Sequence, residues 1–132
     1  MPSNESQPKH FGKASVPLTP AIRAGDFVFV SGQVPTDESG RVVGASIEEQ
    51  THAVLTKIKN LLREAGAELG QVVKTSAFLA DARDFAAFNG VYQTYFTDKP
   101  PTRTTSESRL MIPIKVEIDA IAYAPAAGNS DA

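Results

Sequence analysis

A short run of strand-forming residues, Phe27-Val28-Phe29-Val30-Ser31, constrains the fold of this chain more than any other segment. Aromatic and β-branched residues favour extended structure, and here they occupy both sides of the strand. A strand that is apolar on both sides belongs in a sheet that is covered on both faces. The segment from Val116 to Ala122 also carries apolar residues on both sides. The sequence therefore predicts a sheet with two buried faces.

Two segments have the periodicity of helices. The first opens at Ser46, and Glu49 three residues later completes a capping-box pattern. Apolar residues then recur at helical spacing on one face until Gly66, which is a suitable terminator. A second apolar stripe lies between Phe85 and Tyr95. Because two helices can cover only one face of a sheet, the other face is expected to be buried against a second copy of the chain.

The order of the elements predicts an α+β sandwich of the type β-β-α-β-α-β-β, with both helices on one face of a mixed sheet. The five expected strands are Thr19–Arg23, Phe27–Ser31, Val72–Leu79, Arg103–Arg109 and Lys115–Tyr123. The last two are expected to be neighbours. Residues 15–124 form one predicted domain, and residues 1–14 and 125–132 are polar and without periodicity, as in flexible tails.

The composition excludes several classes of protein. With 132 residues and 42% hydrophobic content, the chain can build one core. Its net charge of −2 gives no basic surface for nucleic acid, and no stretch approaches the roughly 18 apolar residues of a membrane span. Cysteine is absent and the polar N-terminus lacks a secretory signal, so a cytoplasmic location is expected. Neither His10 nor His52 belongs to a metal-ligand motif, and no metal or organic cofactor is expected.

The strongest candidate for chemistry is Arg103, which follows two prolines in Pro100-Pro101-Thr102. The prolines stiffen the turn, and a planar guanidinium held in this way can bind a carboxylate through two parallel hydrogen bonds. Glu117 lies within the last expected strand, where an acid at a polar–apolar boundary can position a water or hold a proton. Each of the two residues would equally serve in a structural ion pair.

Two further residues are candidates with simpler alternatives. Gly32 directly follows a buried strand and permits close approach of the backbone to a ligand, although it would also suit a turn. Asn89 lies near the apolar stripe of the second helix, where it would hydrogen-bond a ligand or tie down the Pro100–Pro101 turn. His52 is expected to be a surface or boundary residue.

Five segments in order resemble the Rid (reactive intermediate deaminase, YjgF-like) family over about residues 15–124. They are Ala24–Pro35 (AGDFVFVSGQVP), Lys74–Asp81 (KTSAFLAD), Phe88-Asn89 with Val91-Tyr92, Pro101–Thr104 (PTRT) and Val116–Ala122 (VEIDAIA). The resemblance implies a chorismate-mutase-like fold that assembles as a homotrimer with ligand clefts between subunits. It also implies hydrolysis of imines, the tautomers of enamines such as 2-aminoacrylate, to 2-keto acids and ammonia without a cofactor.

The same resemblance suggests roles for individual residues. Arg103 matches the family arginine that binds the substrate carboxylate, and Glu117 matches the acid that helps to position the attacking water. Gly32 and Asn89 match positions that line or support the cleft.

Two positions depart from the family pattern. Leu18 stands where family deaminases often carry a tyrosine. If that tyrosine contacts the substrate, the leucine makes the pocket more apolar and removes one hydrogen bond. Thr105 stands where they often carry a cysteine, and the change is harmless if that position works through its backbone.

Three hypotheses about function follow: an imine deaminase, a non-catalytic trimer that binds a small carboxylate at Arg103, and a ribonuclease. The acidic balance and the lack of a histidine-rich site weigh against the third.

Overall fold

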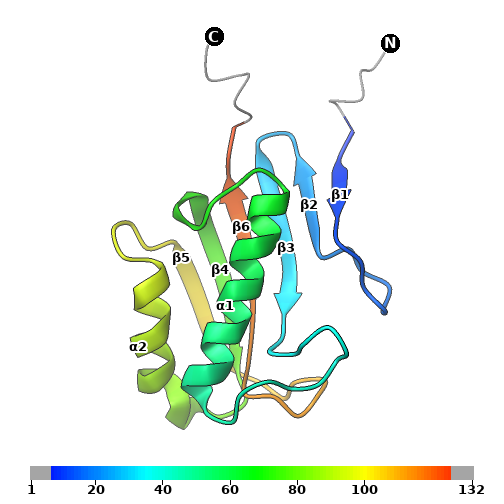
Figure 1. The fold of residues 1–132 in the computed structure, drawn as a ribbon. Coiled ribbons are helices and arrows are strands. Elements are labelled where there is room, and N and C mark those ends of the chain that lie inside the picture. Colours follow the sequence, from blue (N-terminus) through cyan, green and yellow to red (C-terminus); the bar gives the residue numbers. More distant parts are fainter. Residues whose placement is uncertain (1–6, 126–132) are drawn as a thin grey trace.

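The computed structural model describes residues 7–125 and consists of a six-stranded sheet with two α-helices packed on one face (Figure 1). The elements are β1 (Lys9–Phe11), β2 (Ala21–Ala24), β3 (Phe27–Gln33), α1 (Ile47–Glu64), β4 (Val72–Leu79), α2 (Phe85–Tyr95), β5 (Thr102–Glu107) and β6 (Val116–Tyr123), with short 3-10 turns η2 (Leu69–Gln71) and η3 (Ala82–Asp84). The strand order is β1-β2-β3-β6-β4-β5, and β4 and β5 form the parallel pair of this mixed sheet. The predicted α+β class with two helices on one face is confirmed.

Helix α1 covers the middle of the sheet, and local sequence signals set its ends. Ser46 Oγ accepts a hydrogen bond from the Glu49 N–H at 3.1 Å, and Glu49 Oε1 accepts one from the Ser46 N–H, as the capping-box pattern predicted. The helix ends before Gly66, whose φ of +84° is in the region that glycine adopts without strain. The apolar stripe of α1 is fully buried against the sheet through Val54, Leu55, Ile58 and Leu62.

The second face of the sheet is uncovered in the single chain. Val28 and Val30 of β3 are buried beneath the helices, whereas Phe27 and Phe29 on the opposite face remain 42% and 44% exposed. The Phe27 ring lies 5.3 Å from the ring of Tyr123, which is 47% exposed on the adjacent strand β6. We call the side of the sheet that carries these aromatic residues the open face. The prediction that this strand is apolar on both sides holds, but one chain buries only one of them.

The N-terminal boundary differs from the expectation. Residues 1–6 and 126–132 of the predicted tails lie outside the described residues, but the proposed tail of residues 1–14 also includes β1, which pairs with β2. Phe11 in this strand packs against the core. A three-residue edge strand is held by main-chain hydrogen bonds to its neighbour and needs no repeating apolar pattern, so no periodic signal marks it in the sequence.

Candidate functional site

Arg103 lies on the edge strand β5 and is stacked against aromatic rings of α2. Its Cζ atom lies 5.6 Å from the ring centre of Phe85, 5.3 Å from that of Phe88 and 4.7 Å from that of Tyr92. Within residues 7–125, no carboxylate lies at ion-pair distance from this guanidinium. Rings that contact the face of a guanidinium attract its charge and leave the N–H edge available to a carboxylate. The structural ion pair considered for Arg103 is therefore not formed within residues 7–125.

The ring of Tyr92 is held in place by a hydrogen bond to strand β4. Its hydroxyl lies 2.7 Å from Thr75 Oγ1, both side chains are buried, and Thr75 pairs with Arg103 in the β4–β5 register. Burial raises the pKa of Tyr92, so its hydroxyl stays protonated and hydrogen-bonded. Sequence analysis assigned the Tyr92 ring to an ordinary apolar stripe. Since a core stripe and a stack on an arginine have the same helical spacing, no signal in the sequence separates them.

Glu117 lies on the open face of the sheet, directly over Gly32 of the neighbouring strand β3. A Cβ atom added to Gly32 would overlap the Glu117 carboxylate, so within one chain the space next to this glycine is occupied by the Glu117 side chain. Burial raises the pKa of Glu117, and the negative charge of Asp119 adds to the effect. An acid with a raised pKa and a glycine beneath it is suited to exchange protons with a small ligand or a water.

Arg103 and Glu117 do not meet within one chain. The expectation that their strands are neighbours is wrong, because β4 lies between β5 and β6. Arg103 pairs with Thr75, which is buried beneath α2, whereas Glu117 pairs with Phe78 and so points to the open face. The order of the strands depends on pairing between distant segments, which a local pattern does not determine. A site that uses both side chains needs a second copy of the chain.

The other candidate residues are dispersed. Asn89 is on α2, and its Oδ1 atom is buried without a hydrogen-bond partner among the described residues. Leu18 is 48% exposed in the loop between β1 and β2, at the opposite edge of the sheet from Arg103. Thr105 shares the strand face of Arg103, two residues farther along β5. Buried acceptors in folded chains usually have a donor, so Asn89 stays a candidate for contact with a ligand.

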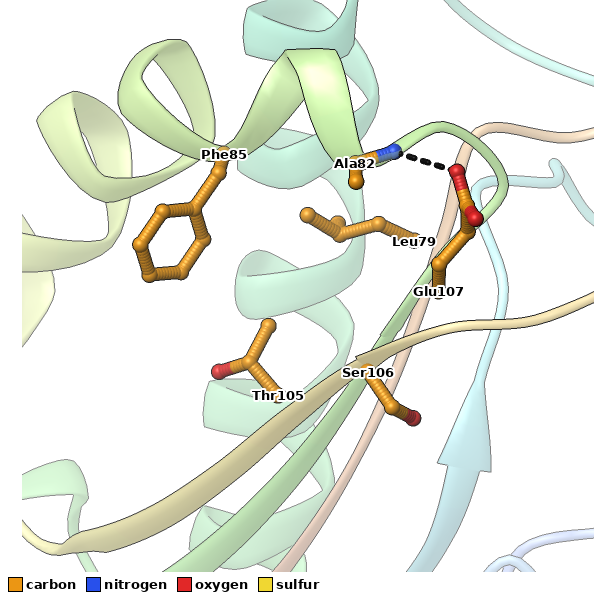
Figure 2. Close-up of a pocket in the computed structure, with 6 residues that line it drawn as sticks. All are labelled: Leu79, Ala82, Phe85, Thr105, Ser106 and Glu107. Carbon is orange, nitrogen blue, oxygen red and sulfur yellow. Dashed lines mark hydrogen bonds between the residues drawn. The ribbon is translucent and has the colours of Figure 1, made fainter.

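A hollow of about 290 Å³ opens between η3, the start of α2 and strand β5, next to the Phe85 ring that contacts Arg103. Its lining consists of Leu79, Ala82, Phe85, Thr105, Ser106 and Glu107, as Figure 2 shows. No pattern in the sequence predicts this hollow. No helix within residues 7–125 combines the length and the apolar character that crossing a bilayer requires. In this part of the chain, no three potential ligand side chains gather closely enough to hold a metal ion.

Replacing Glu117 with glutamine should stabilise the protein at neutral pH and leave its stability unchanged in acid. The folded state raises the pKa of this carboxyl above its ordinary value of 4.5, so the folded protein binds the proton more tightly than the unfolded chain. The wild type therefore loses stability as the pH rises from that value through the raised folded pKa, and the variant does not. Urea unfolding of both proteins at one chain concentration, over a series of pH values, measures the difference. Parallel stability curves would contradict the buried position of the carboxyl.

Comparisons with known proteins agree with this architecture. The family model described as Endoribonuclease L-PSP matches residues 9–124. A RutC family protein of Pyrococcus abyssi is 46% identical over 121 residues, which cover 90% of this chain and 92% of the relative. The 2-iminobutanoate/2-iminopropanoate deaminase of Salmonella typhimurium is 34% identical over 110 residues, covering 80% of this chain and 86% of the relative. The crystal structure of yeast Mmf1 superposes with a TM-score of 0.85 at 31% identity, covering 89% of this chain and 99% of that one. The chain belongs to the Rid (YjgF-like) family.

Proposed function

We propose that this protein hydrolyses small 2-imino acids to 2-keto acids and ammonia, and that Arg103 binds the substrate carboxylate. The observation that carries the proposal is the Arg103 guanidinium, which is stacked on three rings and has no carboxylate partner within residues 7–125. A charge held in this way is ready for an external anion. The name of the Salmonella relative, a 2-iminobutanoate/2-iminopropanoate deaminase, supports the choice of reaction.

The proposed reaction makes modest demands on the protein. A water molecule adds to the imine carbon, the carbon–nitrogen bond breaks, and the two protons of the water leave with the nitrogen as ammonia. Glu117 positions the water and relays a proton between the water and the imine nitrogen. Binding of the carboxylate by Arg103 holds the imine carbon near that water, so most of the acceleration comes from orientation.

The proposed assembly is a homotrimer with a cleft between subunits. Arg103 lies at one edge of the sheet beneath α2, whereas Glu117 is on the open face and Leu18 lies towards the other edge. Packing the open face of one chain near the β5 edge of another would bring the first two residues together. It would also bury the exposed aromatic side chains of Phe27, Phe29 and Tyr123. Gly32 and Asn89 are then proposed to line or support the cleft, and Thr105 to contact the ligand.

Replacing Phe29 with aspartate should dissociate the assembly. Phe29 is 44% exposed in the single chain, and a carboxylate in its place would be buried without a partner on association. Light scattering should show three times the chain mass of 14.1 kDa for the wild type and the single-chain mass for the variant. The matched control is Val42→Asp, at a residue 39% exposed in a loop outside the open face, which should leave the mass unchanged. A wild type that stays at the single-chain mass at micromolar concentration would refute the assembly.

The direct test is the rate of imine loss with purified wild-type protein. An amino-acid oxidase generates the imine, and the reaction is scored against spontaneous hydrolysis. Acceleration supports the deaminase, whereas carboxylate binding without acceleration supports the non-catalytic binding module that the sequence left open. A ribonuclease is the third candidate, and the description of the family model favours testing it. Cleavage of RNA that survives Arg103→Ala, with no effect on imines, would replace the present proposal.

A further inference from the structure

We infer that the hollow beside Arg103 is the subsite for the substrate side chain, and that it selects 2-imino acids with apolar side chains of about the size of leucine's over 2-iminopropanoate. The inference rests on the proposed function, because it assumes that Arg103 holds the carboxylate. It adds the substrate class, which neither the family nor the names of the relatives assign to this chain.

The hollow and the guanidinium share a wall. The Phe85 ring lies 5.6 Å from Arg103 Cζ, lines the hollow and is 45% exposed. Thr105 also lines the hollow and points to the same side of β5 as Arg103. A carboxylate bound at Arg103 therefore has its remaining atoms next to this opening. The volume of about 290 Å³ lies just below the roughly 300–1,000 Å³ typical of small-molecule sites.

The lining favours an alkyl or aromatic group. Leu79, Ala82 and Phe85 supply apolar surface, and Figure 2 shows the Phe85 ring and the Leu79 side chain on the α2 side of the hollow. An alkyl group that enters is removed from water, and each fully buried CH₂ improves affinity by up to about fourfold. Because the hollow is open on one side, a leucine-sized side chain is only partly buried in it. Such a side chain should therefore raise the affinity about tenfold over a methyl group, which is less than complete burial would give.

Glu107 sets a second limit on the substrate. Its Oε2 atom accepts a hydrogen bond from the Ala82 N–H at 2.8 Å, which holds the carboxylate at the rim of the hollow (Figure 2). A substrate whose side chain carries another carboxylate would place two negative charges close together. Repulsion of this kind is an effective way to reject a competing ligand. The structure therefore disfavours imino dicarboxylates at this subsite.

Binding of stable 2-keto acids, followed by NMR titration of the full chain, tests the subsite without depending on catalysis. The wild type should bind 4-methyl-2-oxopentanoate about tenfold more tightly than pyruvate, and 2-oxoglutarate more weakly than 4-methyl-2-oxopentanoate. Ala82→Leu fills the hollow from an exposed position and should abolish the preference for 4-methyl-2-oxopentanoate over pyruvate. The matched control is Ala86→Leu, at an exposed residue of α2 that does not line the hollow, and it should keep the preference. Glu107→Gln keeps an acceptor for the Ala82 N–H and should improve 2-oxoglutarate binding severalfold.

The outcomes separate the two proposals when the same proteins are assayed with imines made from alanine and leucine. Equal affinity for pyruvate and 4-methyl-2-oxopentanoate, or an Ala82→Leu variant that keeps the preference, would overturn the subsite even if both imines are hydrolysed. Side-chain preference in binding without hydrolysis of any imine would overturn the deaminase and leave the subsite intact. No binding of any 2-keto acid would overturn both.

Discussion

Replacing Arg103 with alanine should lower kcat/KM for imine hydrolysis, or the affinity for a 2-keto acid, by at least tenfold. A charge-assisted bidentate contact contributes on the order of 1.5–3 kcal/mol, and no other cation among the described residues shares the Arg103 stack on Phe85, Phe88 and Tyr92. Arg103→Lys keeps the charge but loses the planar fork that matches a carboxylate, so it should also be impaired. Steady-state kinetics and ligand titration on the three proteins measure these losses.

The variant Arg103→Ala is expected to fold and assemble as the wild type does. Arg103 is only partly buried and no ion pair depends on it within residues 7–125, so Arg103→Ala should keep the secondary structure and mass of the wild type. Arg41→Ala, at an exposed arginine in the loop after β3, is the matched control and should retain full activity. Near-normal hydrolysis and carboxylate binding by a correctly assembled Arg103→Ala protein would remove the basis of the proposed function. Loss of assembly would instead make Arg103 an interface residue.

Most of the elements could be predicted from the sequence because their signals are local. The strand Val72–Leu79 was predicted at its observed bounds, and the helix that follows Ser46 begins at the predicted cap. Alternation and helical spacing report the environment of neighbouring residues, which is enough to set such boundaries. Strand β1 was not predicted, because three residues at a sheet edge carry no periodic pattern.

The site could be predicted only in part, since its geometry depends on pairing between distant segments. The residue types at Arg103 and Glu117 were informative, because a stiffened arginine and an acid within an apolar strand are both unusual. A two-residue period shows that Glu117 points away from Val116, but it does not show which side the helices cover or that β4 separates the two strands. The stack on Arg103 and the hollow beside it likewise follow from the packing of α2 on β5.

Mixed assemblies of two inactive variants should recover activity if the site is shared between chains. Because Arg103 and Glu117 lie on opposite faces of one sheet, we expect each cleft to take them from different subunits. Arg103→Ala chains retain Glu117, and Glu117→Gln chains retain Arg103. In random 1:1 co-assembly each of the two positions in a cleft is intact half the time, so about a quarter of the clefts should be complete. Activity of co-expressed, doubly tagged assemblies measures this fraction.

The double variant mixed with wild type provides the control that distinguishes a shared site from a site within one chain. A shared cleft needs two wild-type neighbours, so a 1:1 mixture of wild type with the Arg103→Ala, Glu117→Gln chain should again have about a quarter of its clefts complete. A site within one chain predicts about half for this mixture and none for the mixture of single variants, because every single-variant chain lacks one of the two residues. The two mixtures therefore give equal activity for a shared cleft. For a cleft made by one chain, the mixture with wild type is active and the mixture of single variants is inactive. The second result would contradict the sheet geometry as the basis of the site, since Arg103 would then have to reach Glu117 past strand β4.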